Sequence, residues 1–261
     1  MRNLLKYIMN MNVEETINKY KDKLGQNDFG FLNRVYQTNS KVYLNRLKNI
    51  GFENYNSVLD AGCGYGQWSI SLSKLNSHVL ATDISSSRVI IADDIAKSQN
   101  IKNIDYKQSD LTNIPLKDNS VDAVFSFGVI FLVNIKDALL EFHRVLNKGG
   151  RVYFNTNGLG WALNLWHNEP NKTDDYIPRE TVVKSFKNTL LIENGNKKEN
   201  GQQVSDKKDI IQLIENIGFK LIECDGDGLI NITNNNNEIK PFFQKEYFGF
   251  EGVTEYLIEK I

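Results

Sequence analysis

Three glycines at alternate positions follow directly after a short apolar segment and an acid. The segment covers residues 57–59, the acid is Asp60, and the glycines are Gly62, Gly64 and Gly66. A β-branched strand that runs into a glycine turn and then into a helix-forming stretch builds the ligand-binding corner of a doubly wound α/β sheet. Glycine allows the backbone to approach a ligand where a Cβ atom would clash. The sequence therefore predicts an α/β fold with a ligand site at the end of its first strand.

A second acid stands where a nucleotide-binding fold places a ribose-binding carboxylate. Residues 78–83 read as a strand that ends in Asp83, a little over twenty residues beyond Asp60. We therefore expect the Asp83 carboxylate to accept hydrogen bonds from ribose hydroxyls. An acid before the serines of residues 85–87 also suits the N-cap of a helix, and neighbouring residues could serve both roles.

Three further blocks follow in the next part of the chain. Residues 105–111 have strand character and place Asp110 just past the strand, where an aspartate is also common in an ordinary turn. Residues 114–127 lead into a fourth predicted strand. Residues 138–154 join a helix, a glycine turn and a fifth predicted strand. The alternation of strands and helices predicts a parallel core with right-handed crossovers.

These five blocks, spread over residues 56–156, resemble the motifs of the class I S-adenosylmethionine-dependent methyltransferases that act on small molecules. The glycine spacing agrees, because dinucleotide-binding enzymes favour G-x-G-x-x-G and here the third glycine comes one residue early. Asn147-Lys148 replaces the family's usual Lys-Pro, which is a small departure in a turn. The resemblance implies a doubly wound, Rossmann-like seven-stranded sheet.

The resemblance also implies the cofactor S-adenosyl-L-methionine, with S-adenosyl-L-homocysteine as its product. In that family the glycine loop holds the methionine end of the cofactor, and the acid at the place of Asp110 faces the adenine amino group. The cofactor-binding residues carried over in this way are Asp60, Gly62, Cys63, Gly64, Gly66, Asp83, Ile84, Asp110, Leu111 and Phe127.

Segments on the N-terminal side add to the cofactor-binding core, which we place at residues 56–157. Residues 1–55 are expected to form a helical cap, with helices over 13–24 and 35–50. The aromatic residues 29–32 between them read as a turn, which could cover the cofactor or simply hold the two helices together.

Segments on the C-terminal side complete the molecule. Residues 158–204 have few clean periods and many aromatic residues, and we expect them to form a substrate lid inserted after the fifth strand. Residues 205–261 are expected to complete the core, with a helix over 206–217 and a strand over 219–224. The aromatic stretch 242–250 could supply the final antiparallel strand.

Charge and cysteine content limit the function classes. The 261 residues include 31 basic and 32 acidic side chains, with no basic stripe, so nucleic-acid binding is not expected. Cys63 and Cys224 are the only cysteines, which argues against a disulfide framework and for a reducing, cytoplasmic compartment. The apolar run in residues 1–8 is too short for a signal peptide, and neither a membrane span nor a metal site is expected. The oligomeric state is left open.

Methyl transfer in the resembled family is an in-line displacement, for which the protein aligns the acceptor and excludes water. A general base often helps. His167 in the expected lid is the candidate base, and its alternative role is packing within the lid. The family's frequent histidine after the fourth strand is missing from residues 128–133, which leaves the acceptor type open. The candidate substrate contacts, some of which could instead close the core, are Phe31, Trp161, Trp166 and Tyr247.

Three classes of function remain after this reasoning. The leading one is a methyltransferase acting on an oxygen or nitrogen of a small-molecule acceptor, such as a metabolite, a sugar or a secondary-metabolite intermediate. The second is a methyltransferase acting on a macromolecule such as tRNA or a protein. The third is a non-catalytic cofactor-binding partner protein, because a fold does not prove a reaction.

Overall fold

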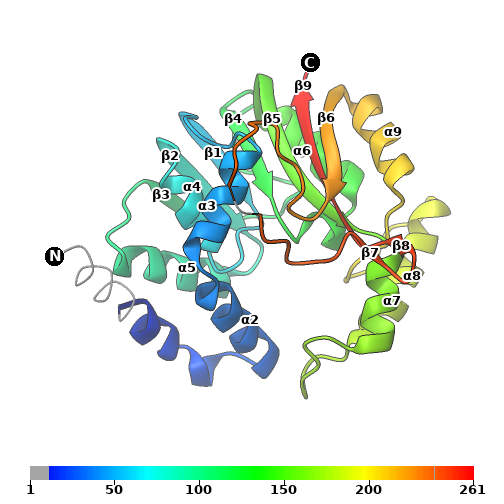
Figure 1. Cartoon of the computed structure of the whole chain (residues 1–261), viewed down its shortest axis with the longest axis horizontal. Helices are drawn as coiled ribbons and strands as arrows, with labels where there is room; N and C mark the ends of the chain where they lie inside the picture. Colours follow the sequence, from blue (N-terminus) through cyan, green and yellow to red (C-terminus); the bar gives the residue numbers. More distant parts are fainter. Residues whose placement is uncertain (1–11, 238) are drawn as a thin grey trace.

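The computed structural model describes residues 12–237 and 239–261 and shows a seven-stranded sheet flanked by helices (Figure 1). The strand order is β3-β2-β1-β4-β5-β9-β6. Strands β1 to β5 run parallel, whereas β9 runs antiparallel to its neighbours β5 and β6. The predicted doubly wound, Rossmann-like seven-stranded fold is therefore confirmed. The strands of this sheet are β1 (Ser57–Ala61), β2 (His78–Asp83), β3 (Ile104–Gln108), β4 (Val121–Ser126), β5 (Leu146–Asn157), β6 (Phe219–Gly226) and β9 (Val253–Lys260).

Helices cover both faces of the sheet, and each layer has its own apolar core. On one face α3 and α4 contribute Leu47 and Trp68, which pack with Phe125 of β4. On the other face α6 and α9 contribute Phe142 and Ile214. The helices are α2 (Gln26–Gln37), α3 (Ser40–Asn49), α4 (Gln67–Ser73), α5 (Ser86–Ser98), α6 (Ile135–Val145), α7 (Leu159–Asn168), α8 (Pro178–Glu193) and α9 (Lys207–Ile217), with helical backbone also over residues 12–18 and short 3-10 turns at Lys21–Lys23 and Ile130–Leu132.

The N-terminal helical segment corrects two sequence predictions. Residues 29–32, predicted as an aromatic turn, lie inside α2, because their apolar side chains at three-residue spacing also suit a helix face. The single helix predicted over 35–50 is broken at Asn39, whose side chain accepts a hydrogen bond from the Lys41 N–H and begins α3. The predicted helix over 13–24 is shorter, and the apolar run in residues 1–8 lies outside the described residues.

The final strand also differs from the prediction. Residues 242–250 do not enter the main sheet; β7 (Glu246–Tyr247) and β8 (Phe250–Glu251) instead form a small separate hairpin. The seventh strand is β9, which lies between β5 and β6 and whose first six residues are all buried, so both of its faces are covered. Its side chains therefore do not alternate between apolar and polar types, and this weakens the period-two signal.

The segment after the fifth strand forms α7 and α8, which follow one another between β5 and α9. In Figure 1 the hairpin of β7 and β8 lies against α7, and the Gly158 N–H donates to the Gly252 carbonyl at 2.7 Å. The division of the chain into four segments, and the role of 158–204 as a lid, stay predictions.

A long connection between β6 and β7 crosses in front of the sheet and reaches α3 (orange in Figure 1). It is fastened there by hydrogen bonds from the Ile232 N–H to the Asn49 carbonyl at 2.9 Å and from the Thr233 hydroxyl to the Lys48 carbonyl at 3.1 Å. Its return path carries Phe242 and Phe243 to the cavity described below.

Residues 12–237 and 239–261 contain neither a candidate membrane span nor a candidate metal site. No helix in these ranges is both long and apolar enough to cross a membrane. No three side chains of His, Cys, Asp or Glu come together there in a way that could hold a metal ion.

Candidate functional site

The glycine loop between β1 and α4 is held by the backbone of β2. The Gly62 and Cys63 N–H groups both donate to the Thr82 carbonyl, at 2.7 and 2.8 Å. A Cβ atom at Gly62 would lie 2.4 Å from a methyl carbon of Val129, so this glycine is required for packing. Gly66 lies at the start of α4, close to Tyr106.

Gly64 is different because open space lies in front of it. A Cβ atom there would meet only the Phe31 ring, at 3.9 Å. Phe31 projects from α2, and α2 is tied to the loop by a hydrogen bond from the Tyr36 hydroxyl to the Tyr65 carbonyl at 2.7 Å. The loop therefore leaves space at its centre, and an aromatic ring borders that space.

Asp83 connects the loop to the next helix. Its carboxylate accepts the Gly64 N–H at 3.0 Å and the Ser85 N–H at 2.9 Å, and the residue is only 6% exposed. The N-cap of α5 is Ser85, whose hydroxyl accepts the Arg88 N–H. The alternative in which Asp83 itself is the N-cap is thus excluded. Binding of ribose by Asp83 remains a prediction, for which the lone pairs left on both oxygens are available.

Three more predicted cofactor residues lie at the ends of β2 and β3. Ile84 follows Asp83 and is 65% exposed, which offers an apolar surface beside the carboxylate. Asp110 accepts hydrogen bonds from the backbone N–H and the hydroxyl of Thr112, at 2.8 and 2.9 Å, so it does shape a turn. Leu111 is buried. A flat ligand could bind against Ile84 with its edge toward Asp110.

Asp60 and Cys63 are buried at the end of β1. The Ser69 hydroxyl donates to the Asp60 carboxylate at 2.5 Å. Burial raises the pKa of Asp60 to about 7, the Ser69 hydrogen bond opposes that shift, and the neighbouring Asp83 charge adds to it. Burial, with the nearby Asp60 and Asp83, also raises the pKa of the Cys63 thiol well above its usual range. Cys63 is therefore a protonated packing residue rather than a nucleophile.

A cavity of about 560 Å³ opens at the carboxyl ends of β4 and β5, within the size range of small-molecule sites. This is the edge at which open α/β sheets bind their ligands. Its aromatic walls are formed by Phe31, Tyr43, Trp68, Phe127, Phe131, Trp161, Tyr176, Phe242 and Phe243. Its amide groups come from Asn27, Gln67, Asn155, Asn157, Asn171 and Gln202.

The cavity includes some of the predicted substrate residues and not others. Phe31 and Trp161 line it, as does the predicted cofactor residue Phe127. Tyr247 lies behind Trp161, with ring centroids 5.8 Å apart. Trp166 is 47% exposed and stands outside the lining.

His167 also lies outside the cavity lining. Its ring packs edge-on against Phe248 of the small hairpin, with centroids 5.5 Å apart. This contact matches the packing role that was its alternative. The position gives no support to His167 as the general base, which remains an untested prediction.

Sequence reasoning missed the polar side chains at the end of β5. Asn155 and Asn157 stand at alternate positions and both line the cavity. The side-chain Oδ1 of Asn155 accepts the Gly128 N–H at 2.6 Å, and the side-chain Nδ2 of Asn157 donates to the Gln202 side chain at 3.1 Å. Two amides at alternate positions at the carboxyl end of a strand could have signalled this.

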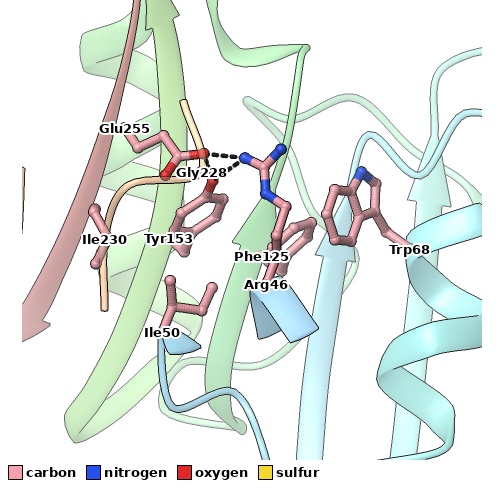
Figure 2. A pocket seen from close by; sticks show the side chains of 8 residues that line it. All are labelled: Arg46, Ile50, Trp68, Phe125, Tyr153, Gly228, Ile230 and Glu255. Carbon is pink, nitrogen blue, oxygen red and sulfur yellow. Dashed lines mark hydrogen bonds and ion pairs between the residues drawn. The ribbon is translucent and has the colours of Figure 1, made fainter. Parts of the chain in front are cut away.

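Arg46 is the centre of a buried charge network. Figure 2 shows its guanidinium between Glu255 and Tyr153 on one side and Trp68, a residue of the cavity lining, on the other. Arg46 of α3 is 4% exposed; its guanidinium donates to Asp227 at 2.6 Å and forms an ion pair with Glu255 of β9. The Tyr153 hydroxyl also donates to Glu255. Burial raises the pKa of Glu255 above its usual range, whereas the Arg46 charge opposes that shift and Asp227 adds to it.

This network supports three aromatic residues of the wall. The Arg46 guanidinium lies 4.7 Å from the ring centroid of Phe242, 5.0 Å from that of Phe127 and 5.6 Å from that of Trp68. Asp227 also accepts the backbone N–H groups of Phe242 and Phe243. The positions of these rings therefore depend on a cation that does not itself line the cavity.

Comparison with known proteins identifies the core. Residues 59–154 match a family model described as a methyltransferase domain. The chain is 39% identical over 100 residues to a malonyl-[acyl-carrier protein] O-methyltransferase of Yersinia pestis, covering 38% of this chain and 36% of that protein. It is 29% identical over 142 residues to a demethylmenaquinone methyltransferase of Staphylococcus carnosus, and the match covers 52% of this chain and 58% of that protein. The chain thus spans between about a third and somewhat over half of these relatives.

A solved structure shows the same fold over most of the chain. It is the geranyl diphosphate C-methyltransferase from Streptomyces coelicolor A3(2), in complex with Mg²⁺, geranyl diphosphate and S-adenosyl-L-homocysteine. The TM-score is 0.59 with 11% sequence identity, covering 87% of this chain and 79% of that one.

Proposed function

We propose that the protein transfers a methyl group from S-adenosylmethionine to an oxygen or nitrogen of a small-molecule acceptor. The match of residues 59–154 to a methyltransferase domain supports this proposal. The observation that carries the proposal is the open space at Gly64, bordered by the Phe31 ring and by the Asp83 carboxylate bonded to the loop. A cavity of small-molecule size adjoins it at the same sheet edge.

The residues at this edge fit the cofactor. The backbone at Gly64 would accommodate its methionine end, Asp83 its ribose hydroxyls, and Ile84 with Asp110 its adenine. When bound, S-adenosylmethionine supplies an electrophilic methyl group on a sulfonium sulfur. The protein's own part is to align the acceptor through the aromatic walls and amides of the cavity and to exclude water.

Partners and location belong to the same proposal. We propose a small-molecule acceptor rather than a nucleic acid, on the grounds of the balanced charge and the aromatic lining of the cavity. We propose a cytoplasmic location, supported by Cys63 and Cys224, both of which are free thiols.

Ligand binding tests the cofactor assignment. Isothermal titration calorimetry should give micromolar dissociation constants for S-adenosylmethionine and S-adenosylhomocysteine, with far weaker binding of NAD and ATP. Asp83→Asn should weaken S-adenosylhomocysteine binding by roughly ten- to hundredfold, because a charged acceptor for the ribose hydroxyls is lost. Asp105→Asn, an exposed carboxylate on β3, is the matched control and should leave the affinity unchanged.

Two results would count against the proposal. Tight NAD binding without S-adenosylhomocysteine binding would overturn the cofactor assignment. Unchanged affinity in a folded Asp83→Asn variant would leave Asp83 with only its role in fastening the loop.

A further inference from the structure

The charged side chains that line the cavity leave one positive charge in excess. Asp28, Arg34 and Arg88 are the only charged residues among its described lining. Arg88 pairs with Asp28 at 2.6 Å. Arg34 is an exposed residue of the lining, and no carboxylate of the described chain forms an ion pair with it. Partial desolvation lowers the pKa of Arg34, whereas Asp28 raises that of Arg88. Arg34 is therefore the group in the cavity to which an anionic ligand would bind.

Arg34 stands beside the glycine loop. Its guanidinium lies 6.0 Å from the Phe31 ring centroid, and that ring is the nearest group to the open space at Gly64. An anion bound by Arg34 would thus lie at the end of the cavity that adjoins the loop.

The described lining also lacks a side chain suited to remove a proton at neutral pH. Its one carboxylate, Asp28, is occupied by Arg88. The three histidines lie elsewhere: His78 pairs with Asp105, His143 packs on Phe219 and His167 packs on Phe248. The remaining polar groups are amides and hydroxyls, which do not act as bases at this pH.

A cavity with this lining suits an acceptor that can be methylated without a general base. An alcohol, a phenol or a carbon acid must lose a proton when it is methylated, and a positioned base normally takes it. A carboxylic acid is already ionised at neutral pH. Its oxygen lone pair forms the new O–CH₃ bond while the electron pair of the C–S bond passes to the sulfonium sulfur. The products are a methyl ester and a neutral thioether, and no proton is released.

Resting on the methyltransferase function proposed above, we propose that the acceptor is a carboxylate with an apolar body, that it is methylated on oxygen to a methyl ester, and that Arg34 binds its anion. The aromatic walls receive the apolar body. Ester formation also removes the negative charge, which weakens the product's attraction to Arg34.

Label chemistry tests the nature of the bond. The purified protein is incubated with methyl-tritiated S-adenosylmethionine and an ultrafiltered metabolite extract of the expressing cells, and separately with decanoate, 1-decanol and decylamine. Alkali releases volatile methanol from methyl esters but not from ethers or methylamines. We expect alkali-labile label from the extract and, in the matched series, from decanoate alone. Alkali-stable label would overturn the inference and leave the methyltransferase function standing, whereas no transferred label would defeat both.

Binding tests Arg34 without turnover. In the presence of S-adenosylhomocysteine, Arg34→Gln should bind decanoate roughly tenfold more weakly than the wild type, and Arg34→Lys should recover part of the loss. Lys41→Gln on α3 is the matched cation control. A carboxylate is also present on S-adenosylhomocysteine itself, so its affinity is compared with that of methylthioadenosine, which lacks one. If Arg34→Gln weakens S-adenosylhomocysteine alone and spares decanoate, Arg34 serves the cofactor and its proposed role toward the acceptor is wrong.

Discussion

At the scale of single residues, two buried acids at neighbouring strand ends have different hydrogen-bond partners. Asp83 accepts two backbone N–H groups, one from the glycine loop and one from Ser85. Asp60 accepts the Ser69 hydroxyl, and burial raises its pKa to about 7. Asp83 thus fastens the loop at the edge where ribose is expected, whereas Asp60 lies behind the loop and is partly protonated near neutrality.

The raised pKa of Asp60 predicts a pH-dependent stability. In the unfolded chain Asp60 ionises at its ordinary acidic pKa, whereas in the folded protein it keeps its proton up to about pH 7. The contribution of Asp60 to stability is therefore largest at low pH, and it is lost as the pH rises from the ordinary pKa of an aspartate to about 7. Asp60→Asn has no carboxyl group to ionise and so does not suffer this loss. The free energy of unfolding of the variant, relative to that of the wild type, should therefore rise by a few kcal/mol as the pH is raised from about 4 to about 7.5.

Thermal unfolding of both proteins across this pH range measures the difference. Ser69→Ala supplies a second test, because removal of its hydrogen bond should move the midpoint of the pH effect upward. A stability difference between Asp60→Asn and the wild type that stays constant with pH would contradict the assignment.

At the scale of elements, the site is a strand, a loop and a helix with a second helix placed over them. β1 and α4 hold the glycine loop, while α2 covers it with Phe31 and is fastened by the Tyr36 hydrogen bond. The ion pair between Arg88 and Asp28 fastens α2 to α5 as well. Opening of the site toward solvent would therefore require α2 to break a hydrogen bond and an ion pair.

Gly64→Ala should separate the loop's role in binding from its role in folding. Gly64 and Gly149 both have positive φ, at +55° and +76°, and no protein atom would clash with a Cβ atom at either. Both alanine variants should therefore lose about 1–2 kcal/mol of stability from backbone strain. Only Gly64→Ala should also weaken S-adenosylhomocysteine, by roughly tenfold or more, because its methyl group enters the space for the methionine end. Equal affinity of the two variants in calorimetry would remove Gly64 from the cofactor site.

At the scale of the whole molecule, Arg46 connects parts of the chain that are far apart in sequence. Asp227 lies 181 residues away and Glu255 lies 209 residues away, yet both carboxylates bind the same guanidinium. Through Asp227 the network also positions the connection that carries Phe242 and Phe243. One buried cation thus joins the cap helix α3, the last strand β9 and the wall of the cavity.

Arg46→Met should lower the free energy of unfolding by about 3–5 kcal/mol, because two buried carboxylates lose their cation. Lys97→Met is the control, since its ion pair with Asp93 is exposed, and it should leave stability nearly unchanged. Adding Asp227→Asn and Glu255→Gln to Arg46→Met should recover part of the loss, because the uncompensated charges are removed. Denaturant unfolding of the wild type and the three variants measures these changes in the free energy of unfolding. If Arg46→Met loses no more stability than Lys97→Met, the network is not important for stability.

Local patterns in the sequence were sufficient for the central elements. The strand predicted to end in Asp83 and the helix predicted over 206–217 agree with β2 and α9 within one residue. The aromatic residues 29–32 were misread because apolar residues at three-residue spacing fit both a turn and a helix. The strand β9 was missed because a strand buried on both faces lacks alternation.

The sequence by itself determined the five parallel strands, the glycine loop and the acids at the ends of β1, β2 and β3, because their signals lie within a few residues of one another along the chain. Only the tertiary structure decided which rings and amides meet in the cavity and that His167 lies outside it. It also decided that no carboxylate of residues 12–237 and 239–261 pairs with Arg34, and that Arg46 is balanced by Asp227 and Glu255. These features depend on contacts between segments far apart in the sequence. Packing, burial and charge neutralisation set such contacts, and no local pattern encodes them.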